Sequence, residues 1–175
     1  MWADRHRAES AAQALGGITA RVDLESIAAH LQVDLHYRSL EPGTSGILIC
    51  TAETRSLVVN QNHSHTRQRF SLAHSLGHAC LHHTPGQEQV FMDQIIRRPR
   101  DDRASKGSYF EEVEANTFAA ALLVPLATLH VEFHDSPVMN PFDLDESYLR
   151  SLSKRLGVSQ QVLSFRLLSV GLLAW

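Results

Sequence analysis

The chain has 175 residues, of which 43% are hydrophobic and 20% charged, the proportions of a folded globular protein rather than a disordered or fibrous one. The formal net charge of −3 argues against binding nucleic acid through overall charge, and two cysteines are too few for a disulfide-rich scaffold. No N-terminal segment has a signal-peptide pattern, and the apolar runs are far shorter than the roughly 20 residues of a membrane span. We therefore expect a soluble, cytoplasmic protein without a membrane partner.

Patterns in the first 60 residues predict two helices followed by three strands. Residues 2–15 form the first predicted helix and residues 23–31 the second, with the aspartate at its start as N-cap. Residues 33–37 alternate apolar and polar side chains, which is typical of a half-buried strand. Residues 46–50 and 56–60 flank a polar segment and predict a β-hairpin.

The rest of the chain is mainly helical in pattern. The predicted segments are a helix over 67–82 with Ser64 as N-cap, a short strand within 89–97, a loop over 97–107, a helix over 111–123 that ends before Pro125, a loop over 134–146, and helices over 147–156 and 159–168. The last two helices, joined at Gly157, give residues 147–170 the pattern of a helix-turn-helix segment. We predict one α+β domain over residues 1–175, with a small mixed or antiparallel sheet packed on helices.

Two histidines in the central predicted helix have a spacing that suits metal binding. His74 and His78 are four residues apart, so their side chains lie about 40° apart around the helix and one turn along it. Both imidazoles can therefore reach one ion, as in the zinc helix of metallopeptidases. The spacing alone is weak in a chain with 11 histidines, but two unliganded imidazoles are costly in a largely apolar helix.

A later helix offers an oxygen ligand. Glu112 and Asn116 are also four residues apart, and small residues such as Ala115 give that face a low profile that lets another helix approach. Glu112 can then supply a carboxylate oxygen, while Asn116 can hold the second ring nitrogen of a histidine ligand. The alternative is that Glu111, Glu112 and Glu114 only favour the start of the helix through their charge.

Two segments closely resemble the helix motifs of the ImmA/IrrE family of zinc metallopeptidases: RFSLAHSLGHACLH at 69–82 and EVEANTFAAALLVP at 112–125. The resemblance extends over most of the chain, including the predicted hairpin and the C-terminal helices. It implies a zincin-like fold, Zn²⁺ as the cofactor, and His74, His78 and Glu112 as its ligands. Choosing Glu112 follows the related zincins, in which the ligand lies four residues before the residue aligned with Asn116.

The chain departs from the family motif at Ser75. The motif is HExxH but reads HSLGH here, so serine stands where the family has its general-base glutamate. A serine hydroxyl without a base beside it can neither take a proton from water nor return one at neutral pH. Zinc affinity should survive, because the missing carboxylate is not a ligand. Both an engineered inactivation and a natural pseudoenzyme account for the serine.

His82 continues the row of histidines by one more turn. On a straight helix it lies about 12 Å from His74, too far for both to bind one ion. We expect His82 to line the cleft or to contact a ligand residue from outside.

The C-terminal segment has a basic bias. From Ser147 onward it contains four basic side chains and no acidic one, which suits nucleic acid; the four are Arg150, Lys154, Arg155 and Arg166. Residues 159–168 are apolar for a helix that reads a DNA groove, so packing or protein docking is the preferred role and DNA contact the alternative.

Three functional hypotheses follow. The first is a zinc endopeptidase-like protein of the type that cleaves a helix-turn-helix transcriptional repressor, as family members in mobile elements or stress responses do, inactive in this form because of Ser75. Its substrate would pair with an exposed strand edge of the hairpin. The second is a non-catalytic zinc-binding partner, or a toxin component held by an antitoxin-like repressor. The third is a DNA-binding module formed by residues 147–168.

Overall fold

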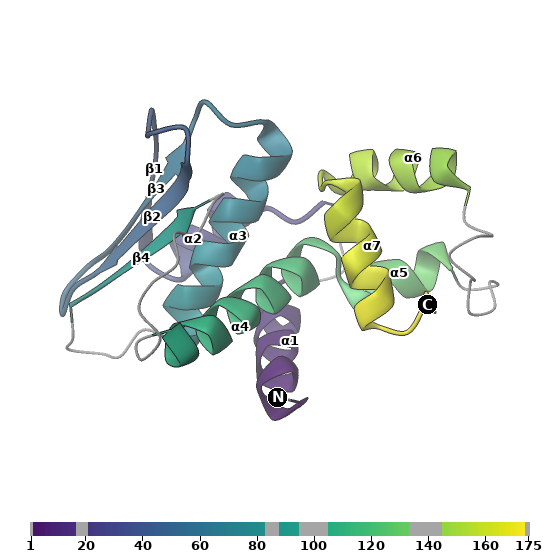
Figure 1. Cartoon of the computed structure of the whole chain (residues 1–175), viewed down its shortest axis with the longest axis horizontal. Coiled ribbons are helices and arrows are strands. Elements are labelled where there is room, and N and C mark those ends of the chain that lie inside the picture. Colours follow the sequence, from purple (N-terminus) through teal and green to yellow (C-terminus); the bar gives the residue numbers. More distant parts are fainter. Residues whose placement is uncertain (1, 17–20, 83–87, 95–104, 134–144, 174–175) are drawn as a thin grey trace.

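The computed structural model describes residues 2–16, 21–82, 88–94, 105–133 and 145–173. These residues form seven helices and four strands, which confirms the predicted mixed α+β class. The sheet makes up one side of the molecule, α3 lies against it, and the remaining helices except α2 lie beyond α3 (Figure 1). The helices are α1 (Trp2–Gly16), α2 (Leu24–His30), α3 (His65–Leu81), α4 (Ser105–Leu123), α5 (Leu126–Glu132), α6 (Glu146–Leu156) and α7 (Gln160–Ser169).

The sheet is mixed and has the order β1-β3-β2-β4. Its strands are β1 (Val33–Arg38), β2 (Thr44–Cys50), β3 (Arg55–Asn60) and β4 (Gln89–Gln94). The hairpin prediction is confirmed by the antiparallel pairing of β2 with β3, but β1 adds to β3 in parallel and β4 adds to β2. Both hairpin strands are therefore internal. The prediction that the hairpin offers an exposed edge is wrong, and the free edges among the described strands belong to β1 and β4.

The ends of the helices agree with the capping residues that the sequence indicates. The backbone N–H of Arg67 donates to Ser64 Oγ at the start of α3, and the N–H of Ser26 donates to Asp23 at the start of α2. The hydrogen bonds from Ser26 also lower the pKa of the Asp23 carboxyl. These caps fix where each helix begins and therefore which side chains its faces present.

Two helical predictions differ from the structure. α4 already begins at Ser105, so the end of the predicted 97–107 loop is helical, and α5 has no counterpart in the predictions. Pro125 ends α4 because the residue before a proline avoids the helical region, and its φ of −60° also suits the start of a helix, so it is the N-cap of α5. The predicted loops over 97–104 and 134–144 fall outside the described residues.

α3 and α4 cross at very close range. A Cβ on Gly77 of α3 would lie 3.2 Å from the Cα and 3.3 Å from the carbonyl oxygen of Ala115 in α4, so the two backbones are nearly in contact. Only glycine fits at that position without moving a helix. This approach lets side chains from one helix reach those of the other.

The C-terminal helices are anchored to the rest of the fold by a buried arginine. Gly157 adopts a left-handed conformation with φ of 67° between α6 and α7, which lets α7 turn back toward α4. Arg166 on α7 is 1% exposed and donates hydrogen bonds to both carboxylate oxygens of Glu9 in α1 and to the carbonyl oxygen of Val124. The predicted helix-turn-helix segment is thus packed against α1 and α4.

Among the described helices, no single one combines the length and the apolar composition needed to cross a membrane. Residues 109–123 of α4 and the whole of α5 pass such a test only when joined, with a bend of 47° between them.

Candidate metal centre

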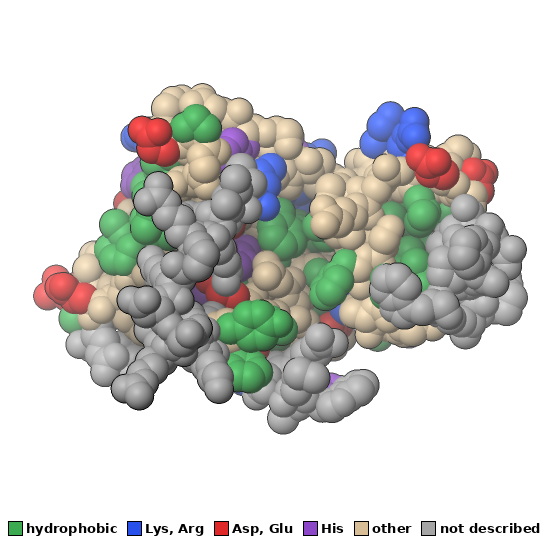
Figure 2. All heavy atoms as spheres, in the orientation of Figure 1, with side chains coloured by type: hydrophobic (Ala, Val, Ile, Leu, Met, Phe, Trp, Pro, Cys, Tyr) green, Lys and Arg blue, Asp and Glu red, His purple; other side chains and the backbone are tan. Residues whose placement is uncertain are grey.

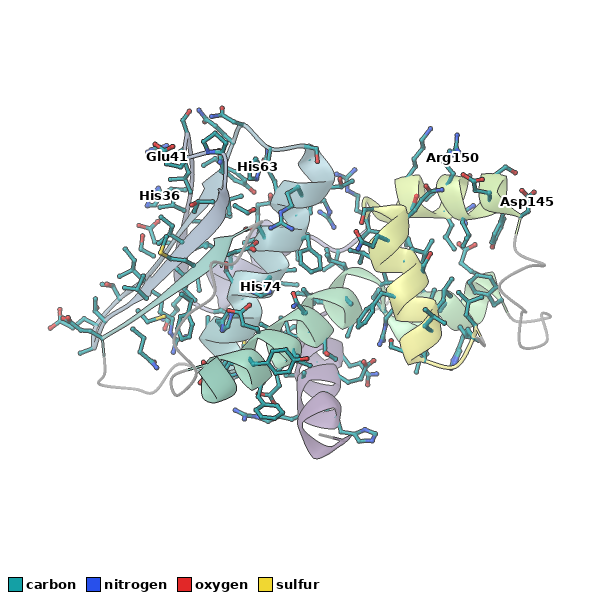
Figure 3. The ribbon with its side chains drawn as sticks, in the orientation of Figure 1. His36, Glu41, His63, His74, Asp145 and Arg150 are labelled. Carbon is teal, nitrogen blue, oxygen red and sulfur yellow. The ribbon has the colours of Figure 1, made fainter. Side chains whose placement is uncertain are left out.

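α3 holds His74 and His78 on the face that meets α4. Their side chains are only 4% and 3% exposed, and their Nε2 atoms lie 3.2 Å apart. His74 projects from α3 toward α4, whereas the labelled His36 and His63 lie near the far end of the sheet (Figure 3). The two histidines with four-residue spacing therefore meet at one point, as predicted.

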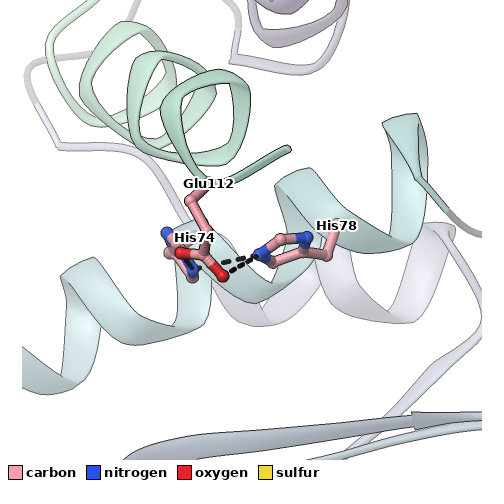
Figure 4. A group of neighbouring side chains, drawn as sticks. All are labelled: His74, His78 and Glu112. Atoms are coloured by element: carbon pink, nitrogen blue, oxygen red, sulfur yellow. Dashed lines mark hydrogen bonds and ion pairs between the residues drawn. The ribbon is translucent and has the colours of Figure 1, made fainter. Parts of the chain in front are cut away.

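α4 brings Glu112 to the same point (Figure 4). Its Oε2 lies 3.4 Å from His74 Nε2 and its Oε1 lies 3.5 Å from His78 Nε2. The potential ligand atoms of these three side chains all lie within 4.8 Å of one another, so the group can hold a metal ion. Glu114, the alternative on the same helix, instead contacts His82, with 2.9 Å between Oε2 and Nε2.

The closest separations within the group are near those of a tetrahedral site. Metal–nitrogen and metal–oxygen bonds of about 2.0–2.1 Å place neighbouring tetrahedral ligand atoms about 3.3–3.4 Å apart. The two Nε2 atoms lie 3.2 Å apart, and each of them has a different oxygen of Glu112 at 3.4 or 3.5 Å, so a small turn of the carboxylate brings one oxygen within this range of both. Glu112 is 17% exposed, so solvent reaches the group from its side. Two imidazoles, one carboxylate and an open side therefore fit a divalent ion with one position left for another ligand.

Asn116 fixes the orientation of one histidine. Its Oδ1 lies 3.1 Å from His74 Nδ1. A carbonyl oxygen only accepts hydrogen bonds, so His74 Nδ1 carries the proton and the lone pair of Nε2 points toward Glu112. The structure thus places Asn116 where the sequence predicts it.

Ser75 is buried between α3 and β2. The residue is 3% exposed, and a Cβ on Gly46 of β2 would lie 3.6 Å from Ser75 Oγ and 2.5 Å from Ser71 Oγ. Strand β2 therefore passes so close to α3 that glycine is needed at position 46. Position 75 lies next to His74 in α3 but offers a hydroxyl in place of a carboxylate.

Two aromatic rings flank the histidines. The ring of Phe91 in β4 stacks on that of His78 with 4.5 Å between centroids, and the ring of Phe70 lies 6.3 Å from that of His74. Phe91 was missed at the sequence level because no motif distinguishes it from an ordinary strand residue. Only the pairing of β4 with β2 brings it to the site.

A groove runs between two residues that contact His74, Phe70 and Asn116, and the C-terminal helices. It has a volume of about 500 Å³, and its wall on the α7 side includes Val162 and Phe165. Phe165 is 47% exposed. The C-terminal segment therefore forms one wall of a surface that begins beside His74.

Neither cysteine belongs to the metal group in the part of the chain that the structure describes. Cys50 is fully buried in β2 and Cys80 is half-buried in α3. Burial raises the pKa of both thiols, which keeps them protonated at neutral pH.

Comparison with known proteins places this arrangement in a family. The profile of Peptidase_M78, described as an IrrE N-terminal-like domain, matches residues 28–168. This chain belongs to the ImmA/IrrE family. The family is one of metallopeptidases, and the mixed α+β architecture is consistent with its zincin-like fold.

A protein of Bacillus phage phi105 is similar as well. It is named "Uncharacterized immunity region protein 2" and is 29% identical over 134 residues, which cover 73% of this chain and 78% of that protein.

Proposed function

We propose that this ImmA/IrrE chain is a zinc metallopeptidase-like protein of the type that cleaves a helix-turn-helix transcriptional repressor, and that Ser75 leaves it without significant peptidase activity. The proposal is carried by the convergence of His74, His78 and Glu112 in a member of a metallopeptidase family. Two histidines and a carboxylate with an open position are the ligand set of catalytic zinc sites. We further propose that the chain acts as one domain in the cytoplasm.

The name of the phage relative supports a repressor as the partner. That protein is assigned by its name to a phage immunity region, and the ImmA/IrrE resemblance points to the same class of substrate. A helix-turn-helix repressor is accordingly the first candidate to test.

The residues of the site have separate tasks in this proposal. Bound zinc would polarise a scissile carbonyl and lower the pKa of a water molecule. His74, His78 and Glu112 would hold the ion, and Asn116 keeps His74 in the tautomer that presents Nε2. Ser75 occupies the place of the general base, which usually contributes about 10²–10⁴-fold to the rate, so its hydroxyl predicts a loss of that order.

The free edge of β4 is suited to an extended substrate. Val90 and Met92 are 62% and 44% exposed, whereas Phe91 between them stacks on His78. A peptide that pairs with this edge would run past the metal group, because β4 itself does. We therefore place the substrate on β4 and not on the hairpin.

A non-catalytic role is the second candidate, and Ser75 is the observation that favours it. A protein that keeps its ligands but lacks the base can bind a repressor or antitoxin without cleaving it. Such a protein would act as a zinc-containing partner or as the toxin component of a repressor–antitoxin pair.

The charges of α6 and α7 favour a packing role over DNA contact. Arg150 pairs with Glu146, Arg155 with Glu132 and Arg166 with Glu9. Figure 2 shows blue and red side chains side by side over the α6 end of the molecule. An acidic partner for most of the basic side chains removes the charge that would attract phosphate.

Restoring the glutamate tests the proposed function. We expect Ser75→Glu, loaded with zinc, to cleave a candidate helix-turn-helix repressor, whereas the unchanged chain binds that repressor and leaves it intact. The matched controls are Ser75→Ala, which removes the hydroxyl without adding a base, and Ser75→Glu combined with His78→Ala.

The controls separate the two candidates. Cleavage by Ser75→Glu that disappears with His78→Ala supports the peptidase. A folded, zinc-loaded Ser75→Glu that binds the repressor but does not cut it supports the non-catalytic partner. If the chain bound neither zinc nor the repressor, both candidate functions would be wrong.

A further inference from the structure

His82 and Glu114 form a buried pair behind one of the proposed ligands. His82 Nδ1 lies 2.9 Å from His78 Nδ1, and His82 Nε2 lies 2.9 Å from Glu114 Oε2. The side chains of His82 and Glu114 are only 5% and 10% exposed. A continuous row of hydrogen bonds therefore runs from Glu114 in α4 through His82 to His78 in α3.

With His82 in its neutral form, the hydrogen-bond partners assign each proton in this row. A carboxylate accepts, so His82 Nε2 carries a proton and donates it to Glu114, which leaves the Nδ1 of a neutral His82 as a lone pair. That lone pair can only accept, so His78 Nδ1 must donate. The lone pair of His78 Nε2 then faces Glu112 and His74.

The two histidines of the metal group are thus oriented from opposite sides by different means. His74 is held directly by the Asn116 carbonyl, at 3.1 Å, and His78 is held by a carboxylate acting through a second imidazole. Both arrangements aim an unprotonated Nε2 at the same point, where the two atoms lie 3.2 Å apart. Two lone pairs cannot hydrogen-bond to each other, so this geometry prepares the group for a cation.

We propose that Glu114 and His82 are a positioning pair that fixes His78 in its Nδ1–H tautomer and thereby sets the metal affinity of the site. The inference rests on the proposed function insofar as it takes the group to be a zinc site. Partners that orient a ligand histidine from outside typically account for 10–100-fold in metal affinity. His82 is placed outside the metal group because both of its ring nitrogens are engaged, one with Glu114 and one with His78.

Two measurements on the full chain test the pair. The zinc dissociation constant is measured by competition with a chromophoric chelator for the unchanged chain, Glu114→Gln, His82→Ala and the control Glu111→Gln. The tautomer of His78 is read from ring ¹⁵N chemical shifts of the zinc-free protein at about pH 8, where an ordinary imidazole is neutral.

Glu114→Gln keeps the shape of the side chain but can present either an acceptor or a donor to His82. We expect it and His82→Ala to weaken zinc binding about 10–100-fold and to turn the single Nδ1–H form of His78 into a mixture. Glu111→Gln removes an equal charge one turn away from the contact and should change neither reading. Unfolding curves for each variant separate a positioning effect from a loss of fold.

The outcomes distinguish this inference from the proposed function. If the unchanged chain binds zinc while Glu114→Gln has the same dissociation constant and the same tautomer, the positioning pair is wrong and the zinc site stands. If no form binds zinc, the proposed function fails, and the ¹⁵N shifts still decide the tautomer: an Nε2–H form in the unchanged chain overturns the pair.

Discussion

The α3–α4 crossing and the α6–α7 pair each concentrate one kind of side chain, histidine in the first and arginine or lysine in the second. In the crossing, the imidazoles are buried and their Nε2 atoms lie near one another and near a carboxylate. In the C-terminal pair, most basic groups point toward separate acidic partners. The same sequence signal, a local excess of one residue type, therefore marks a site in one region and a packed surface in the other. Convergence, rather than composition, separates the two.

The largest expected effect is at the crossing. His78→Ala removes one of the proposed ligands, so zinc affinity should fall by more than the roughly 10–100-fold that loss of an outer partner costs. Metal content after dialysis and chelator competition measure it. His36→Ala on β1 is the control, because its ring contacts Asp34 of the same strand and lies away from His74. If both variants bound zinc with equal affinity, His78 would not be a metal ligand.

The next largest effect concerns the anchor of the C-terminal pair. Arg166→Met leaves Glu9 without its partner and deletes the bond to Val124, and breaking such a pair should lower the free energy of unfolding by about 3 kcal/mol. Arg150→Met breaks the exposed pair with Glu146 and should cost less than about 0.5 kcal/mol. Urea unfolding of both variants measures the difference. Equal values would mean that α7 is not held by its buried arginine.

A smaller effect is expected from widening the crossing. Gly77→Ala places a Cβ 3.1 Å from the Phe118 ring and 3.2 Å from Ala115 Cα, which should cost about 1–3 kcal/mol and weaken zinc binding. Gly43→Ala, where no atom lies within 4 Å, is the control. Thermal unfolding with and without zinc checks both parts. An unchanged zinc affinity together with a lower stability would show that the group tolerates a wider gap.

The smallest effect is expected at the C-terminal surface. Lys154→Ala should leave any affinity for duplex DNA, and its salt dependence, unchanged. A titration at several salt concentrations measures both. A fall of about one unit in the salt slope would mean that Lys154 contacts a phosphate and would restore the DNA hypothesis.

Much of the fold was predictable because its signals are local. The hairpin, the strand at β1 and the helices that contain His74, Glu112 and Arg166 follow from side-chain periodicity and capping residues, and the structure confirms them. α5 is not predicted, because the sequence pattern around Pro125 indicates only the end of a helix. The places of β1 and β4 in the sheet depend on contacts between distant segments, which periodicity does not encode.

The candidate site divides in the same way. The four-residue spacings of His74 with His78 and of Glu112 with Asn116 are local, and the structure brings all four side chains together. The contact of Phe91 with His78 depends on how β4 adds to the sheet, and that of Glu114 with His82 on how α3 crosses α4. Neither has a sequence motif of its own.

The ion pair between Glu9 and Arg166 limits how far the chain can be shortened from its N-terminal side. α1 precedes residues 28–168, the span matched by the family profile, yet it covers α4 with Ala8 and Ala12 and neutralises a guanidinium inside that span. Trimming the chain to the family boundary would expose apolar surface of the core. It would also leave the buried guanidinium of Arg166 without its acidic partner. The first helix is therefore part of the hydrophobic core. A fragment that omits it should aggregate.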